Sequence, residues 1–221
     1  MIARPSRWKV SSTHYKLAMD STMPGHTDER FLLWVDAVGG FLVCCGSKVV
    51  LGQAAPGNRI DVPIQGDLAR RHATLCRDHE GYTLCVEGPT RINGAPVRGA
   101  AALRDGALIE LGSAVKFRFR LPHPLSCTAQ LVPASHHRTQ PASDGVLLLA
   151  DTCLLGPGAG NHIVARHLTQ DVLLFRQSGE LRCRSSGTIE IDGVAWRGEG
   201  PVSTHSRVCG EQFSMTLEEI D

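Results

Sequence analysis

The sequence predicts an all-β fold made of two tandem β-sandwich domains. Apolar residues that recur every three or four positions over several turns are almost absent, whereas short stretches with strand composition are dense. Turn signals containing glycine separate these stretches at intervals of about eight to twelve residues, a pattern typical of a sandwich. The order of the stretches in the first half recurs in the second half, so we expect one kind of sandwich formed twice.

The expected strands of the first half begin with two hairpins. Residues 31–45, FLLWVDAVGGFLVCC, predict a hairpin that turns at Gly39-Gly40, and 48–52 predicts a further strand. Residues 72–86, HATLCRDHEGYTLCV, predict a second hairpin that turns at 79–81.

An Asn-Gly turn and an alternating strand complete this half. Asn93-Gly94 lies between two short expected strands, and a Gly-Ser turn precedes the strand 115–121. In that strand Val115 and every second residue after it are apolar, while Lys116, Arg118 and Arg120 are basic. A period of two predicts a sheet with one buried and one solvated face.

The second half repeats these landmarks. VLLLADTCLLG matches FLVCCGSKVVLG, GNHI at 160–163 matches GNRI at 57–60, and Asp192-Gly193 matches Asn93-Gly94. Two prolines near 121–126 mark the expected boundary. The predicted organisation is a tail or added edge segment at 1–29, a sandwich at 30–122 and a second sandwich at 125–221.

Composition limits the classes of function. The chain has 221 residues and a net charge of +1, so it gives no reason to expect a nucleic-acid partner. Residues 1–122 hold 16 Lys and Arg against 11 Asp and Glu, whereas 123–221 hold 7 against 11. This asymmetry fits docking between the two domains or an anionic partner for the first one, and the alternative is two unrelated surface compositions. The second sandwich could also serve as a homodimer surface.

Targeting and metal-binding signals are weak. No apolar run approaches the roughly 20 residues of a membrane helix, so no membrane insertion is expected. None of the eight cysteines forms a C-x-x-C pair, and most lie in apolar stretches. We therefore expect a cytoplasmic protein without a metal site or cofactor.

Four segments of the first repeat together resemble the forkhead-associated (FHA) domain family. They are VVLGQ, NRIDVPIQGDLARRHATL, INGAPV and LRDGALIELG, spread over residues 31–121. The resemblance implies a phosphothreonine-binding β-sandwich whose end loops recognise a peptide. The second repeat resembles the same family more faintly, mainly through the first.

The resemblance also implies roles for individual residues. Gly52, His72, Asn93 and Gly94 match structural positions of the family motifs. Gln53 and Ala69 stand where the family has its phosphate-binding arginine and serine, and Gly88 aligns with an asparagine. The candidate peptide- or anion-binding residues are Gln53, Arg70, Arg71, Thr90 and Arg91, because guanidinium and hydroxyl groups donate hydrogen bonds to anions.

The predicted function is non-catalytic protein–protein interaction or scaffolding by FHA-like domains that have lost most phosphothreonine-binding residues. One alternative is a phosphothreonine-peptide reader of the signalling type that uses Arg70 and Arg71. A second is an enzyme with a site between the sandwiches, although no nucleophile motif such as G-x-S-x-G supports one. No catalytic residue is predicted.

Overall fold

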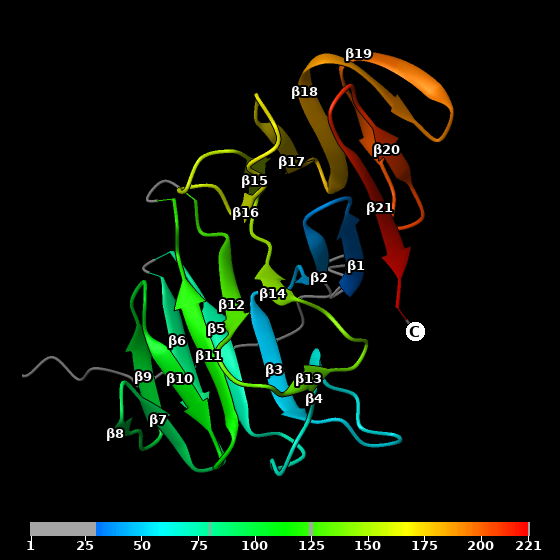
Figure 1. Ribbon diagram of the computed structural model, residues 1–221. Coiled ribbons are helices and arrows are strands. Elements are labelled where there is room, and N and C mark those ends of the chain that lie inside the picture. The colour runs from blue at the N-terminus through cyan, green and yellow to red at the C-terminus, as the bar shows by residue number, and fades with distance from the viewer. Residues whose placement is uncertain (1–29, 80, 124–125, 221) are drawn as a thin grey trace, which may run out of the picture.

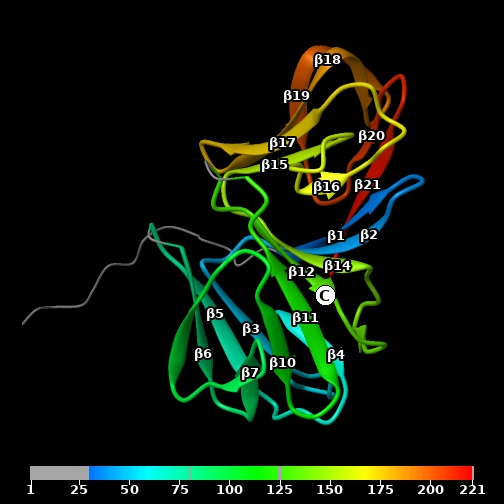
Figure 2. The ribbon, with the colours of Figure 1, turned by 60° about the vertical axis from the view of Figure 1, so that its left-hand side comes forward.

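The structure is a computed structural model that describes residues 30–79, 81–123 and 126–220, and every helix or strand element among them is a strand (Figure 1). The predicted all-β class is therefore confirmed. The predicted tail at 1–29 lies outside the described residues. Figure 2 shows two layered bodies, with β1, β2 and β14 between them.

The first sandwich packs two layers of strands. One layer is a separate six-stranded sheet in the order β13 (Arg138–Thr139), β4 (Val62–Gln65), β3 (Lys48–Gln53), β5 (Ala73–Arg77), β6 (Tyr82–Val86) and β9 (Ala100–Leu103). The facing layer runs in the order β14 (Gly145–Leu148), β12 (Ala129–Pro133), β11 (Val115–Arg120), β10 (Leu108–Leu111), β7 (Thr90–Ile92) and β8 (Ala95–Pro96). The predicted alternation is confirmed in β11, where Val115, Phe117 and Phe119 are buried.

The second sandwich continues the same long sheet. Its strands are β16 (Ile163–Val164), β15 (Thr152–Gly156), β17 (Val172–Gln177), β18 (Glu180–Ile191), β19 (Val194–Val202), β20 (Arg207–Cys209), β21 (Ser214–Glu219), β1 (Arg30–Val35) and β2 (Gly39–Cys44). The β18–β19 hairpin is long and has an irregularity between Arg184 and Thr188. Two separate apolar cores fill the two sandwiches.

Strands β1, β2 and β14 contribute to both cores. Leu42 and Leu148 pack in the first core, whereas the neighbouring Val43 and Leu147 pack in the second. A strand buried on both faces needs a nearly continuous apolar run, which FLLWV, FLVCC and VLLLA supply.

The two repeats exchange the strand pairs that open them, which are β1–β2 in the first repeat and β12–β14 in the second. The last strand of the first repeat, β11, pairs with β12, which opens the second repeat, and Phe119 lies opposite Leu131. The last strand of the second repeat, β21, pairs with β1, and Leu217 lies opposite Leu33. Edge strands β2 and β14 then pair in parallel and join the two halves into one sheet.

The predicted division between 30–122 and 125–221 falls between β11 and β12. Because of the exchange, strands from each side of this division lie in both cores. The two sequence repeats thus correspond to two sandwiches, but each sandwich contains strands from both repeats.

Turn geometry supports part of the expected repeat. Asn93 and Asp192 have φ values of 51° and 53°, and the glycines after them both have φ 81°. Asn93 Oδ1 accepts a hydrogen bond from the Leu108 N–H, and Asp192 Oδ1 accepts one from the Arg207 N–H. The two turns are therefore equivalent, as predicted.

Two details of the sequence prediction are wrong. The first hairpin turns at 36–38, with Ala37 at φ 61°, and not at Gly39-Gly40, which open β2. The match of GNHI to GNRI is also displaced. Strand pairing aligns Ile163 with Val62, so His162 is the counterpart of Asp61.

Candidate functional site

The candidate binding residues lie at one end of the first sandwich: Arg70 and Arg71 lie on a loop there, Gln53 ends β3, and Thr90 and Arg91 open β7. Three loops meet at this end. These loops connect β3 to β4 at 54–61, β4 to β5 at 66–72, and β6 to β7 at 87–89. The rigid sheets beneath hold the loops next to one another, which is how a sandwich brings distant residues to one surface.

His72 connects two of these loops. Its side chain is buried, the ring Nδ1 accepts a hydrogen bond from the Ala69 N–H at 3.2 Å, and Nε2 donates to the Pro89 carbonyl at 3.0 Å. Its own carbonyl accepts from the backbone N–H groups of Glu87 and Gly88. The ring therefore fixes the loop at 66–72 against the loop at 87–89.

Gly52, at the end of β3, allows the loop at 66–72 to approach closely. A Cβ at this position would lie 2.0 Å from the Arg70 carbonyl oxygen. The Gln53 N–H donates to the Ala69 carbonyl at 3.0 Å. Asn58 Nδ2 then donates to the carbonyls of both Gln53 and Arg70 at 2.9 Å, so all three loops are hydrogen-bonded together.

The predicted donors differ in their orientation. Arg70 and Arg71 are exposed, and Arg71 Nε lies 3.9 Å from Glu87 Oε1, with both side chains about half exposed. Gln53 is half-buried at the end of β3. Thr90 is buried, and its hydroxyl donates to the Gly88 carbonyl at 3.0 Å, so it braces the loop and does not face solvent.

A groove of about 930 Å³ borders these loops. Its lining includes Ala69, His72, Thr90 and Arg91, with the further cations Arg98 and Lys116. The lining also holds two carboxylates, Asp67 and Glu110, against the three cations Arg91, Arg98 and Lys116. Glu110 Oε1 lies 2.7 Å from Lys116 Nζ. The hydrogen bond from Lys116 is the main cause that lowers the pKa of Glu110, and the charge of Arg91 adds to it.

Three residues of this site were not predicted from the sequence. Arg98 and Lys116 line the groove, and Asn58 connects the loops. Lys116 lies on the polar face of an alternating strand, and Arg98 follows the Asn93-Gly94 hairpin, but neither lies in a motif segment. Asn93 and Gly94 form the exposed turn between β7 and β8, which is a structural position.

The corresponding end of the second sandwich is different. Its groove has a volume of about 270 Å³ and a lining rich in hydroxyl and amide groups, without Lys, Arg or His. Thr169 donates to Gln212 Oε1 from its backbone N–H and from its hydroxyl, which joins two loops there. Of these two grooves, only the one in the first sandwich is lined by cationic side chains.

Two structural features are missing from residues 30–79, 81–123 and 126–220. They contain no group of three or more His, Cys, Asp or Glu that could hold a metal ion. They also contain no helix long and apolar enough to span a bilayer.

The geometry thus defines a β-sandwich protein that presents a braced, cationic loop surface. No family model matches this sequence, and no curated protein is significantly similar to it. Solved structures are similar. The FHA-2 domain of the Mycobacterium tuberculosis ABC transporter Rv1747 is 20% identical over 60% of this chain and 99% of that domain, with a TM-score of 0.32.

Two further FHA domains are similar in the same way. One, from an analysis of phosphothreonine-dependent FHA interactions, is 24% identical over 43% of this chain and 99% of its own length, with a TM-score of 0.33. The Rv0020c FHA domain is 23% identical over 40% of this chain and 91% of its own length, with a TM-score of 0.28. All three belong to the family that the sequence motifs resemble.

Proposed function

We propose that this chain is a non-catalytic protein-interaction module. The loop end of the first sandwich binds an acidic segment of a partner protein, and the chain serves a scaffolding or signalling assembly in the cytoplasm. The observation that carries the proposal is the cationic groove beside loops that His72 and Asn58 hold rigid. Loops that are ordered before binding lose less conformational entropy when a peptide docks.

The charges at this end favour an anionic ligand. Arg70 and Arg71 are exposed next to Ala69, which lines the groove, and Arg91, Arg98 and Lys116 lie in the groove itself. Of these, Lys116 is paired with Glu110, and Arg71 is only loosely paired with Glu87. A guanidinium grips a carboxylate or a phosphate through two parallel hydrogen bonds, so both side-chain chemistries fit.

The residues at three positions of this end give phosphothreonine no special advantage over a carboxylate. Gln53 carries no charge, Ala69 has no hydroxyl, and a Cβ at Gly88 would lie 2.4 Å from the His72 ring. These are the positions that the family resemblance links to phosphate binding. Losing two or three charge-assisted hydrogen bonds of ~1.5–3 kcal/mol each would weaken phosphopeptide binding by roughly two to six orders of magnitude.

The test is a comparison of matched peptides. A peptide array with Thr, phosphothreonine or Asp at one fixed position selects the tightest sequences, and calorimetry then measures all three forms. We expect Asp and phosphothreonine peptides to bind within about 10-fold of each other, and Arg70→Ala with Arg71→Ala to weaken both by about 10-fold or more. Arg197→Ala, on the exposed surface of the second sandwich, is the matched control.

Two results would contradict this proposal. Affinity that falls at least 100-fold when Asp replaces phosphothreonine would establish the phosphothreonine reader that uses Arg70 and Arg71. Equal affinity for Thr and Asp peptides would show that charge does not contribute to recognition.

A further inference from the structure

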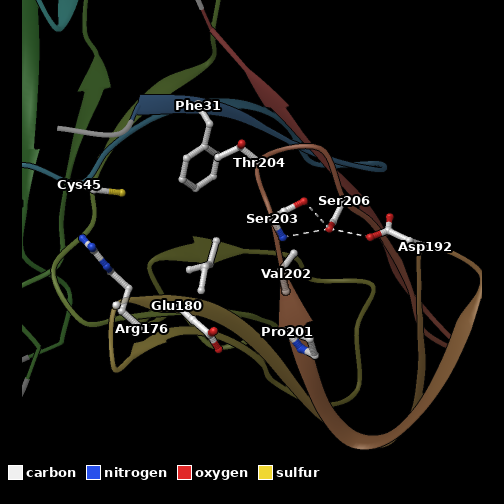
Figure 3. Close-up of a pocket in the computed structure, with 12 residues that line it drawn as sticks. Phe31, Cys45, Arg176, Glu180, Asp192, Pro201, Val202, Ser203, Thr204 and Ser206 are labelled. Atoms are coloured by element: carbon white, nitrogen blue, oxygen red, sulfur yellow. Dashed lines mark hydrogen bonds between the residues drawn. The ribbon is translucent and has the colours of Figure 1, made fainter. Parts of the chain in front are cut away.

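A second cavity lies in the other half of the molecule, at the end of the second sandwich near the first. Its volume is about 500 Å³. Figure 3 shows the residues that line it. Phe31 of β1 and Cys45 after β2 form one side, so the exchanged hairpin contributes to its wall. Arg176, Leu181 and Val202 form part of the other side. This volume lies in the range of small-molecule sites, about 300–1,000 Å³.

The first sandwich provides an internal comparison for this cavity. Arg77 of β5 lies opposite Tyr82, just as Arg176 of β17 lies opposite Leu181. The Arg77 N–H donates to the Ser47 carbonyl and the Arg176 N–H to the Asp151 carbonyl, which confirms that the two arginines are equivalent.

The cavity forms because the second sandwich has smaller side chains at this end. Tyr82 fills the space in the first sandwich and packs edge-on against Phe119, with ring centroids 5.2 Å apart. The counterparts are leucines, Leu181 and Leu217. Phe31 replaces the smaller Ala129 and restores only part of the lost bulk.

The two equivalent arginines have different partners. The Arg77 guanidinium donates to the Tyr82 hydroxyl at 3.5 Å and to the Cys45 carbonyl at 3.3 Å. Among the described residues, no hydrogen bond or ion pair involves the Arg176 guanidinium. Arg176 shares a strand face with the buried Leu174, and Figure 3 shows its side chain extending towards Cys45.

The hydroxyl groups on the far wall already have partners. Ser206, the counterpart of Ala107, donates from its hydroxyl to Asp192 Oδ2 at 2.7 Å and accepts from the Ser203 N–H at 2.9 Å (Figure 3). The hydrogen bonds with Ser203 and Asp192 therefore fix the position of the Ser206 hydroxyl. Arg176 is therefore the strong hydrogen-bond donor of this cavity that has no acceptor among the described residues. Its side chain is half-buried, and burying a charge without a hydrogen-bond acceptor is energetically unfavourable.

We propose that this cavity binds a small organic carboxylate with an apolar body. The carboxylate accepts two hydrogen bonds from the Arg176 guanidinium, and the apolar body packs against Phe31, Leu181 and Val202. Glu180 and Asp192 also line the cavity, and both Asp192 oxygens accept hydrogen bonds, from the Ser206 hydroxyl and the Arg207 N–H. Their negative charges oppose every anion, and they oppose a dianion such as a phosphate monoester more strongly than a monocarboxylate. The site is separate from the loop-end groove and does not depend on the function proposed for it.

The probe for the test is naphthalene-2-carboxylate, with naphthalene-2-carboxamide as the uncharged control of the same shape. Calorimetry measures affinity for the full chain, and amide chemical shifts identify the site. We expect the carboxylate to bind at least 10-fold more tightly than the carboxamide and to shift the amides of Phe31 and Val202. Arg176→Gln removes the difference between the two compounds.

Matched variants separate the guanidinium from the cavity. Leu181→Tyr places the side chain of the first sandwich in the cavity and should abolish binding without lowering the thermal midpoint. Arg77→Gln, at the equivalent position, should leave binding unchanged, and Arg197→Gln replaces it if that variant does not fold.

The proposal is overturned by any of three results. These are no measurable carboxylate binding, equal affinity of the wild-type chain for carboxylate and carboxamide, or unchanged carboxylate binding in Arg176→Gln or Leu181→Tyr.

Discussion

Acidification from pH 7 to pH 5 is expected to destabilise the second sandwich through His162. This side chain is 1% exposed, and its Nδ1 accepts a hydrogen bond from the Leu154 N–H at 3.0 Å. Its Nε2 is buried without a hydrogen-bond partner among the described residues. Burial lowers the pKa of His162 to about 4, and the nearby His123, with ring centroids 6.3 Å apart, acts in the same direction. The Thr128 backbone acts in the opposite direction and is the smallest of the three causes.

The direction and size of the effect follow from proton binding. The unfolded chain binds a proton at this histidine below about pH 6.5, whereas the folded chain does so only below about 4. The stability that depends on neutral His162 is therefore fully present above pH 6.5 and is lost progressively as the pH falls from 6.5 to 4. At pH 5 the loss is about 2 kcal/mol of unfolding free energy.

Urea unfolding at pH 7, 6 and 5 tests this expectation, with His162→Asn as the comparison. The asparagine oxygen can accept from the Leu154 N–H, as the Asp61 carboxylate does for Val50 in the first sandwich, but it does not titrate. Burial also lowers the pKa of His137, and this contribution is common to both proteins. Wild type should lose about 2 kcal/mol more than the variant between pH 7 and 5. Parallel curves for the two proteins would refute the reasoning.

Three further predictions concern the fold. Gly52→Ala should cost about 1–3 kcal/mol in urea unfolding and weaken peptide binding, because its Cβ would collide with the Arg70 carbonyl; a neutral effect would contradict the close approach. Leu42→Ala in the shared strand β2 should lower the free energy of unfolding by about 2–5 kcal/mol. It should also lower the protection of backbone amides from hydrogen exchange in both sandwiches together, and a loss of protection confined to one sandwich would contradict the shared core. The isolated fragment 30–122 lacks β12 and β14 and should not form a stable monomer in size-exclusion chromatography and circular dichroism, so a stable folded monomer would argue against the exchange.

The fold class could be predicted from local patterns, but the pairing of the hairpins could not. Alternation in 115–121 and the Asn93-Gly94 turn depend on neighbouring residues, which the sequence shows directly. Which hairpin lies beside β11 depends on contacts between residues far apart in the chain. Since the two repeats resemble each other, their hairpins have similar patterns, and the sequence does not distinguish the exchanged arrangement from separate domains.

The displaced turn has a particular cause. Gly39-Gly40 resembles a hairpin turn, but a Cβ at Gly40 would lie 2.3 Å from the Trp34 ring. The glycine is needed for packing across the hairpin, and the turn itself uses Ala37 at positive φ. Glycine marks either a turn or a close approach, and sequence alone does not separate the two.

The candidate site could be predicted only in part for a similar reason. The motif segments point to Gln53, Arg70 and Arg71, which lie at this end of the sandwich, but the hydroxyl of Thr90 turns inward to the Gly88 carbonyl. Lys116 enters the groove from a strand outside the motifs. Side-chain direction and contributions from neighbouring strands both require the three-dimensional arrangement.

The exchanged hairpin has a consequence for how the two halves behave together. Leu42 belongs to the first core and Val43 to the second, so β2 cannot leave one core without disturbing the other. Phe31 and Cys45, both at the open end of the same hairpin, also line the cavity that contains Arg176. A ligand bound to that cavity, as proposed above, would therefore stabilise the hairpin by mass action, and through the shared strands it would also stabilise the sandwich that carries the cationic groove. The fold thus connects the two sites through buried contacts of a single sheet.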